Sequence, residues 1–146
     1  MSKLSIVLSA FAFVLMVTHF ANAQELPKAA KYENVTWYQV VYIKFKPGKA
    51  DDALKIIYDH FVPADKASGR EIINFDMRTG EWHHVVYFPM EDGASGLAWK
   101  VAPKGEKWWA ELAKQLGGAK KAQELLAKFN ELVADRKSEI VMRRME

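Results

Sequence analysis

The chain has 146 residues, a formal net charge of +3 and no cysteine. This length suits one hydrophobic core, and the lack of cysteine excludes disulfides, thiolate nucleophiles and Cys-ligated metals. Lysines alternate with acidic residues towards the C-terminus, so the small positive excess forms no basic face and predicts no binding to nucleic acid.

The first 23 residues have the pattern of a secretory signal peptide. Lys3 is the only charge in this segment, an apolar stretch occupies residues 4–20, and Ala21, Asn22 and Ala23 supply the small residues that signal peptidase reads. The alternative is an uncleaved membrane anchor, but polar residues interrupt the stretch, which falls short of the ~20 residues of a spanning helix. We expect cleavage before Gln24, export to the periplasm or beyond, and no membrane attachment afterwards.

The mature chain is expected to hold one domain, at residues 36–146, preceded by a short polar linker at residues 24–35. Aromatic and β-branched side chains dominate residues 36–46, which predicts a strand. Pro47 and Gly48 end it, because neither residue favours a continuing strand.

A helix is predicted next. Apolar residues recur at helical spacing from Ala50 to Phe61, and Gly69 closes the segment. Because proline cannot donate to the helical ladder and disfavours helical geometry before it, Pro63 is expected to end or kink the helix at Val62.

A β-hairpin follows, with strands at Glu71–Met77 and Trp82–Phe88. We favour a three-residue loop, Arg78-Thr79-Gly80, with Gly80 in the left-handed region, because β-branched Thr79 tolerates a two-residue type I′ turn badly. This register puts Asp76 opposite Trp82 and diagonal to His84.

Strand alternation then places Asn74, Asp76, Trp82 and His84 on one face of the hairpin. A two- or four-residue loop would instead bring His83 opposite Asp76. A carboxylate beside a histidine can form a general base, so Asn74, Asp76 and His84, with His83 as the alternative, are the candidate catalytic residues. The competing interpretation is a hydrogen-bonded pair at a sheet edge or a dimer interface.

The C-terminal third predicts two helices and a strand. Beyond a loop and an ambiguous piece at residues 89–101, one helix runs from Pro103 to Leu116, and a second continues to Val133 after a break at Gly117-Gly118. The last strand is expected at Ser138–Arg144. The order strand, helix, strand, strand, helix pair, strand is that of ferredoxin-like βαββαβ folds with a four-stranded antiparallel sheet.

The first strand is apolar on both faces, so both faces of the sheet need cover. Helices cover one face, and a second copy of the sheet is the simplest cover for the other, which predicts a homodimer. The two sets of side chains are Val41, Ile43 and Phe45, and Tyr38, Val40 and Tyr42.

With this element order, and with the segments Tyr42–Lys49 and Thr79–Trp82, the chain resembles the dimeric α+β barrel superfamily from Trp37 to Arg143. That superfamily includes antibiotic-biosynthesis monooxygenases, heme-degrading monooxygenases and many uncharacterised small proteins. The resemblance implies a homodimer with its two sheets face to face and a pocket between sheet and helices in each subunit. The heme-degrading branch places a histidine on the second helix region, whereas no histidine follows His84 here, so we expect no cofactor.

Two functions fit these features. The first is an exported binding or accessory protein that holds a small apolar or aromatic ligand, and the alternative is a cofactor-independent monooxygenase-like enzyme acting on a small aromatic or electron-rich substrate. No metal-ligand spacing is present, so no metal is expected. The candidate ligand-binding residues are aromatic: Trp82, Trp99, Tyr38 and Tyr42.

Overall fold

The computed structural model describes residues 26–145, which divide into two units at Lys31 and Tyr32. In the first unit, residues 26–31 are exposed and contain neither helix nor strand. The second unit, from Tyr32 onwards, holds every helix and strand described. None of these helices is both long and apolar enough to cross a membrane. The predicted signal peptide lies outside the described residues, so its cleavage stays a prediction.

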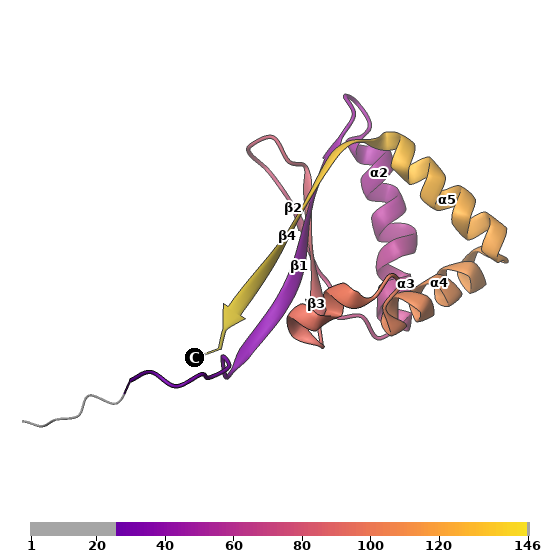
Figure 1. The fold of residues 1–146 in the computed structure, drawn as a ribbon. Coiled ribbons are helices and arrows are strands. Elements are labelled where there is room, and N and C mark those ends of the chain that lie inside the picture. Colours follow the sequence, from indigo (N-terminus) through magenta and orange to yellow (C-terminus); the bar gives the residue numbers. More distant parts are fainter. Residues whose placement is uncertain (1–25, 146) are drawn as a thin grey trace, which may run out of the picture. The chain divides into compact units, whose positions relative to one another are not determined.

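The second unit has the element order that the sequence predicts (Figure 1). Strands alternate with helical segments, and short π and 3₁₀ helices (η1 and η2) lie between them. In chain order the elements are β1 (Val35–Phe45), α2 (Ala50–Ile56), η1 (Ile57–Phe61), α3 (Val62–Ala67), β2 (Ile73–Asp76), β3 (His84–Met90), η2 (Gly93–Ala98), α4 (Pro103–Leu116), α5 (Ala119–Leu132) and β4 (Val133–Arg144).

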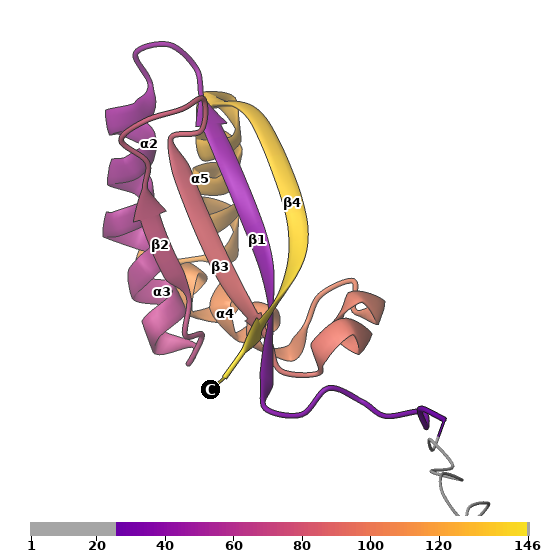
Figure 2. The ribbon, with the colours of Figure 1, turned by 90° about the vertical axis from the view of Figure 1, so that its left-hand side faces the viewer.

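The four strands form one antiparallel sheet in the order β2-β3-β1-β4. Helices α2, α3, α4 and α5 all lie on one side of this sheet, as Figure 1 shows. Figure 2 shows the opposite side, where no helix covers the strands. The predicted ferredoxin-like arrangement is confirmed.

Strand β4 begins at Val133, five residues before the predicted start at Ser138. It pairs with β1 along its whole length, from Val35 opposite Arg144 to Phe45 opposite Val133, with one irregularity at Lys44/Phe45. Residues 134–137 are exposed and mostly polar, so their side chains carry no alternating apolar signal. The backbone of β1, rather than burial of side chains, orders this part of β4.

The first helical segment continues past Pro63 to Ala67 instead of ending at Val62. It does so through the π-helical turn η1, in which Val62 N–H donates to the carbonyl of Ile57, five residues earlier. In a regular α-helix the ring of Pro63 would meet the carbonyl of Asp59 and offer it no N–H. The wider turn of η1 accommodates the proline, which then occupies the first turn of α3.

The hydrophobic core lies between the sheet and the helices. One buried cluster joins the sheet to α2, η1 and α5, and a smaller one joins α3, α4 and α5. The members of the first are Ile43, Phe45, Val86, Ala53, Ile56, Ile57 and Phe129, and those of the second are Ala64, Leu112 and Ala122.

The side of the sheet without helices, called the open face from here on, is lined with aromatic rings. Tyr87 makes edge contacts with Phe75 and Tyr38, at centroid distances of 5.7 and 5.9 Å. Val40 is fully buried on this face, yet Phe75 is 50% exposed. Both faces of the sheet are thus apolar, as the first strand predicts.

Candidate functional site

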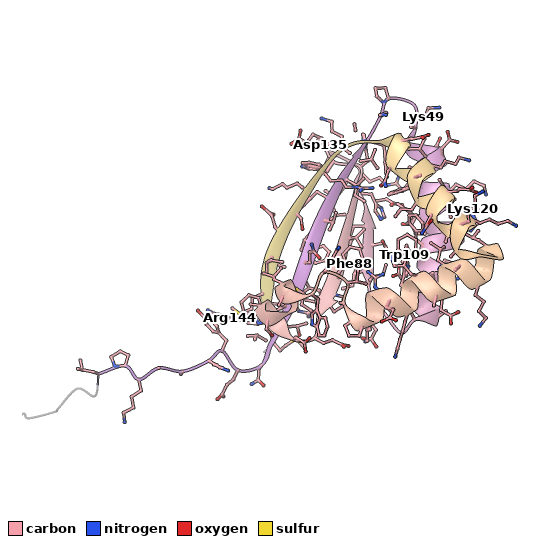
Figure 3. The ribbon with its side chains drawn as sticks, turned by 45° about the vertical axis from the view of Figure 1, so that its right-hand side comes forward. Lys49, Phe88, Trp109, Lys120, Asp135 and Arg144 are labelled. Carbon is pink, nitrogen blue, oxygen red and sulfur yellow. The ribbon has the colours of Figure 1, made fainter. Side chains whose placement is uncertain are left out.

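A cavity of about 620 Å³ lies between the sheet and the helices. Its walls are largely aromatic and aliphatic, with a few charged side chains among them. Figure 3 shows Phe88 of β3 and Trp109 of α4 in the layer between sheet and helices. The wall includes the aromatic and polar residues Gln39, Phe61, Asp65, Arg70, Asn74, Phe88, Trp99, Trp108 and Trp109.

Trp99 lines the cavity, as expected, at the segment between η2 and α4. It is 53% exposed, and its Nε1–H donates to Asp92 at 3.2 Å. Trp108 is half-buried, and its indole N–H lies 3.4 Å from the carbonyl oxygen of Phe61. The two tryptophans therefore occupy different depths of one cavity.

Asp65 and Arg70 meet at the cavity because of how α3 ends. Gly69 has φ +72°, which glycine adopts without steric penalty, and it reverses the chain. The backbone N–H of Arg70 then donates to the carbonyl of Asp65 at 2.9 Å, and the Ser68 hydroxyl donates to the same carbonyl at 2.9 Å. This helix end brings the Arg70 guanidinium to 3.1 Å from Asp65 Oδ1.

The Asp65 carboxyl is only 5% exposed, and its burial raises its pKa to about 6, against the opposing effect of Arg70. Nη1 of Arg70 lies at ion-pair distance from Oδ1 but is not aligned as a hydrogen bond. No residue within 26–145 donates a hydrogen bond to that oxygen. The guanidinium itself lies over the rings of Phe88 and Trp108, at 5.0 and 5.6 Å, which holds it in place.

A second polar group surrounds His84, which is fully buried on β3. Its Nδ1–H donates to Asp76 Oδ1 at 2.8 Å, and its Nε2 lies 3.1 Å from Asn74 Oδ1. The Tyr58 hydroxyl donates to the same Asp76 oxygen at 3.0 Å, and its ring stands edge-on to the imidazole. Burial lowers the pKa of His84, while the Asp76 carboxylate works in the opposite direction.

The structure brings together Asn74, Asp76 and His84, and it places His84, not His83, beside Asp76. The hairpin loop is longer than predicted, because Asp76 lies directly opposite His84 and the chain between Met77 and His83 forms the turn. Gly80 has the predicted left-handed conformation, at φ +85°. The predicted three-residue loop is therefore wrong, and Asp76 pairs with a residue two positions further along the chain than predicted.

His83 has a different environment from His84. Its ring stacks on Phe45, with centroids 5.7 Å apart, and its Nδ1 accepts the backbone N–H of Phe45 at 2.8 Å. These contacts hold the hairpin to β1. Trp82 packs against Tyr42, so it does not share a face with His84 as predicted.

Tyr38, Tyr42 and Trp82 do not line the cavity, so their predicted role in ligand binding stays a prediction. The two tyrosines lie on the open face, since their neighbours in β1, Gln39 and Val41, face the cavity. Both faces of β1 are apolar, so alternation alone could not identify the face that the helices cover.

Of the three residues around His84, only Asn74 lines the cavity. Asp76 and His84 lie behind it, so they would reach a bound molecule through the Asn74 amide. A role for these residues in catalysis stays a prediction. Within residues 26–145 no group of three His, Asp or Glu side chains is placed to hold a metal ion.

Sequence reasoning missed Asp65 and Arg70. Two signals could have found them: Asp65 follows Phe61 and Val62 at helical spacing, on the face that lines the cavity, and Gly69 predicts a chain reversal just before Arg70.

No protein-family model matches the chain, and no curated protein matches it. Solved structures do resemble it. A NIPSNAP family protein with unknown function from Agrobacterium tumefaciens is 16% identical, with a TM-score of 0.52 over 81% of this chain and 97% of that one.

An uncharacterized NIPSNAP-like domain protein from Burkholderia xenovorans is 14% identical, with a TM-score of 0.51 over 79% of this chain and 89% of that one. A dimeric ferredoxin-like protein from an uncultured marine organism is also 14% identical, with a TM-score of 0.47 over 77% of this chain and 90% of that one. The sheet order and the likeness to the Agrobacterium and Burkholderia structures show that the chain has a ferredoxin-like α+β fold.

Proposed function

We propose that the protein is an exported binding or accessory protein that holds a small, mostly apolar and aromatic molecule in the cavity between sheet and helices. The observation that carries this proposal is the cavity itself. Its volume of about 620 Å³ falls within the roughly 300–1,000 Å³ of small-molecule pockets. Its walls include Phe61, Phe88, Trp108 and Trp109, whose ring faces and edges suit a planar aromatic ligand.

Export is part of this proposal and rests on the signal-peptide pattern of residues 1–23. A homodimer is part of it too. The open face carries Ile73 and Phe75 at 41% and 50% exposure, next to the rings of Tyr87 and Tyr38. Exposed apolar side chains gathered on one sheet face favour association, and a second copy brings the same face to meet them.

A cofactor-independent monooxygenase-like enzyme is the second candidate function. The observation that favours it is the pair formed by the buried His84 and the partly exposed Asp76, which Asn74 connects to the cavity wall. Buried carboxylate–histidine pairs of this kind also occur as structural elements, so binding remains the first proposal.

The binding proposal is tested by calorimetric titration with uncharged aromatic compounds of one to three rings. Gln39 lies on the cavity wall yet is exposed, so Gln39→Trp is expected to fill part of the cavity without disturbing the core. Lys120→Trp, on the outer side of α5, is the matched control, because the Lys120 side chain is 90% exposed (Figure 3).

We expect micromolar binding of at least one compound by the wild type and by Lys120→Trp. Gln39→Trp should bind at least about 10-fold more weakly, a change of about 1.4 kcal/mol. Equal affinity in all three proteins would place the ligand elsewhere, and no binding of any compound would refute the proposal.

A further inference from the structure

We propose that the ligand is a neutral aromatic molecule carrying a hydroxyl group, and that this hydroxyl donates a hydrogen bond to Asp65 Oδ1. The inference rests on the proposed binding function and goes further by naming the chemistry that the cavity selects. It begins from Asp65 Oδ1, the one buried side-chain oxygen of the described residues that has no hydrogen-bond partner, which lies in the cavity wall.

Asp65 Oδ1 is an acceptor that lacks a donor. The side chain is 5% exposed, so bulk water does not hydrate it, and the nearest charged nitrogen, Nη1 of Arg70, is not aligned as a donor to it. Buried polar atoms in native proteins are almost always hydrogen-bonded, and a bound ligand is one way in which such an atom is satisfied. A donor on a molecule in the cavity would complete this site.

The charges at the site favour a neutral donor. Asp65 and Arg70 form an ion pair whose charges cancel, so an anionic ligand would meet the carboxylate and a cationic ligand would meet the guanidinium. Arg70 is also held between the Phe88 and Trp108 rings, which limits its freedom to turn towards an anion. The other charged residues of the wall are Glu71, Glu91, Lys100, Lys104 and Arg136.

The proton stays on the ligand in this arrangement. A phenol has a pKa of roughly 10, as tyrosine does, whereas that of Asp65 is about 6. The carboxylate is therefore too weak a base to remove the proton and acts as a hydrogen-bond acceptor only. A site that reads a hydroxyl in this way rejects analogues that lack it, because the buried oxygen is then left without a donor.

The test compares 2-naphthol with 2-methoxynaphthalene by calorimetry at pH 7.5. The two compounds share the same rings, but only the first has a hydroxyl to donate. Hydrogen bonds to charged groups are strong, so we expect the wild type to bind 2-naphthol at least about 10-fold more tightly. In Asp65→Asn the acceptor is neutral, and the preference should fall to about 3-fold or less. Asp59→Asn changes an exposed carboxyl of η1 and should keep the wild-type preference.

A second measurement uses the wild type alone, so it tests the proposal even if Asp65→Asn fails to fold. At pH 6 the Asp65 carboxyl is partly protonated, so 2-naphthol binding should release protons, and the measured heat should depend on the buffer. 2-Methoxynaphthalene should show no such dependence.

Equal affinity of the wild type for the two compounds would overturn this inference and leave the binding proposal standing. An unchanged preference in Asp65→Asn, or 2-naphthol binding without proton release at pH 6, would show that Asp65 is not the acceptor. Absence of binding by either compound, in a protein that binds no other aromatic ring, would refute both proposals.

Discussion

Replacing His84 with alanine tests how strongly its buried polar network holds β2 to β3. The His84 side chain is fully buried, with Asp76 and Asn74 at its two ring nitrogens and the Tyr58 ring edge-on to it. Truncating a buried ring costs about 2–3 kcal/mol, and the hydrogen bond from Nδ1–H to the charged Asp76 carboxylate contributes about 1.5 kcal/mol. Asp76 is 30% exposed and keeps the Tyr58 hydroxyl, so its carboxylate is not left without partners.

We therefore expect His84→Ala to lose about 4 kcal/mol of unfolding free energy, which lowers Tm by roughly 15 °C for a domain of this size. Urea unfolding followed by circular dichroism measures the loss. His84→Phe keeps the ring volume and should lose about 2 kcal/mol, while His60→Ala, on η1, should lose less than about 1 kcal/mol. A loss below about 1 kcal/mol in His84→Ala would refute the argument.

This expectation has a practical result for any activity that is found. A drop in activity of His84→Ala would not separate chemistry from stability, because the side chain belongs to the core. Asn74→Ala is the better probe, since Asn74 lines the cavity and is only half-buried.

Four further predictions concern pH, assembly and processing. Because the pKa of Asp65 is about 6 in the folded state and 3.8 ordinarily, the folded state keeps this proton up to about pH 6. The stability of the wild type relative to Asp65→Asn should therefore fall by about 3 kcal/mol as the pH rises from about 4 to about 6. Relative stability that does not change with pH in urea titrations would contradict this expectation. His84 acts in the opposite sense, because its lowered pKa makes the folded state lose stability as the pH falls below about 6.5, and an unchanged pH profile in His84→Phe would argue against this role. Light scattering of the mature domain at low micromolar concentration should report twice the chain mass for the wild type and one chain mass for Phe75→Lys. A monomeric wild type would exclude the dimer through the open face. Intact-mass analysis of the exported protein should show a chain that begins at Gln24, and a retained Met1 or Ser2 would contradict cleavage.

The fold was predictable from the sequence because its main elements carry regular patterns. The apolar spacing of α4 and α5, the break at Gly117 with φ +77°, and the aromatic strand β1 each pointed to the observed element. Strand β4 was only partly predictable, because residues 134–137 are ordered by pairing with β1 and show no apolar alternation. The local pattern does not record a partner that is distant in sequence.

The candidate site was less predictable. The association of His84 with Asp76 followed from strand alternation, because a shift of two residues leaves each side chain on the same face. The loop length could not be predicted in this way. Asp65 could not be ranked above other acidic residues, since its importance comes from burial at 5% exposure and from the turn that returns Arg70 to it. Tyr38 and Tyr42 were misplaced because both faces of β1 are apolar.

The π-helical turn η1 sets the phase of everything that follows it in the helix. An α-helix advances about 100° per residue, so the extra residue held by an i→i+5 turn rotates the next segment by about that angle. Asp59 is half-exposed in η1, and deleting it would remove the extra residue of this turn. The chain beyond would then be out of phase with the sheet, and Asp65 would turn away from the cavity. One residue of helix length thus decides whether the Asp65 carboxyl faces this cavity.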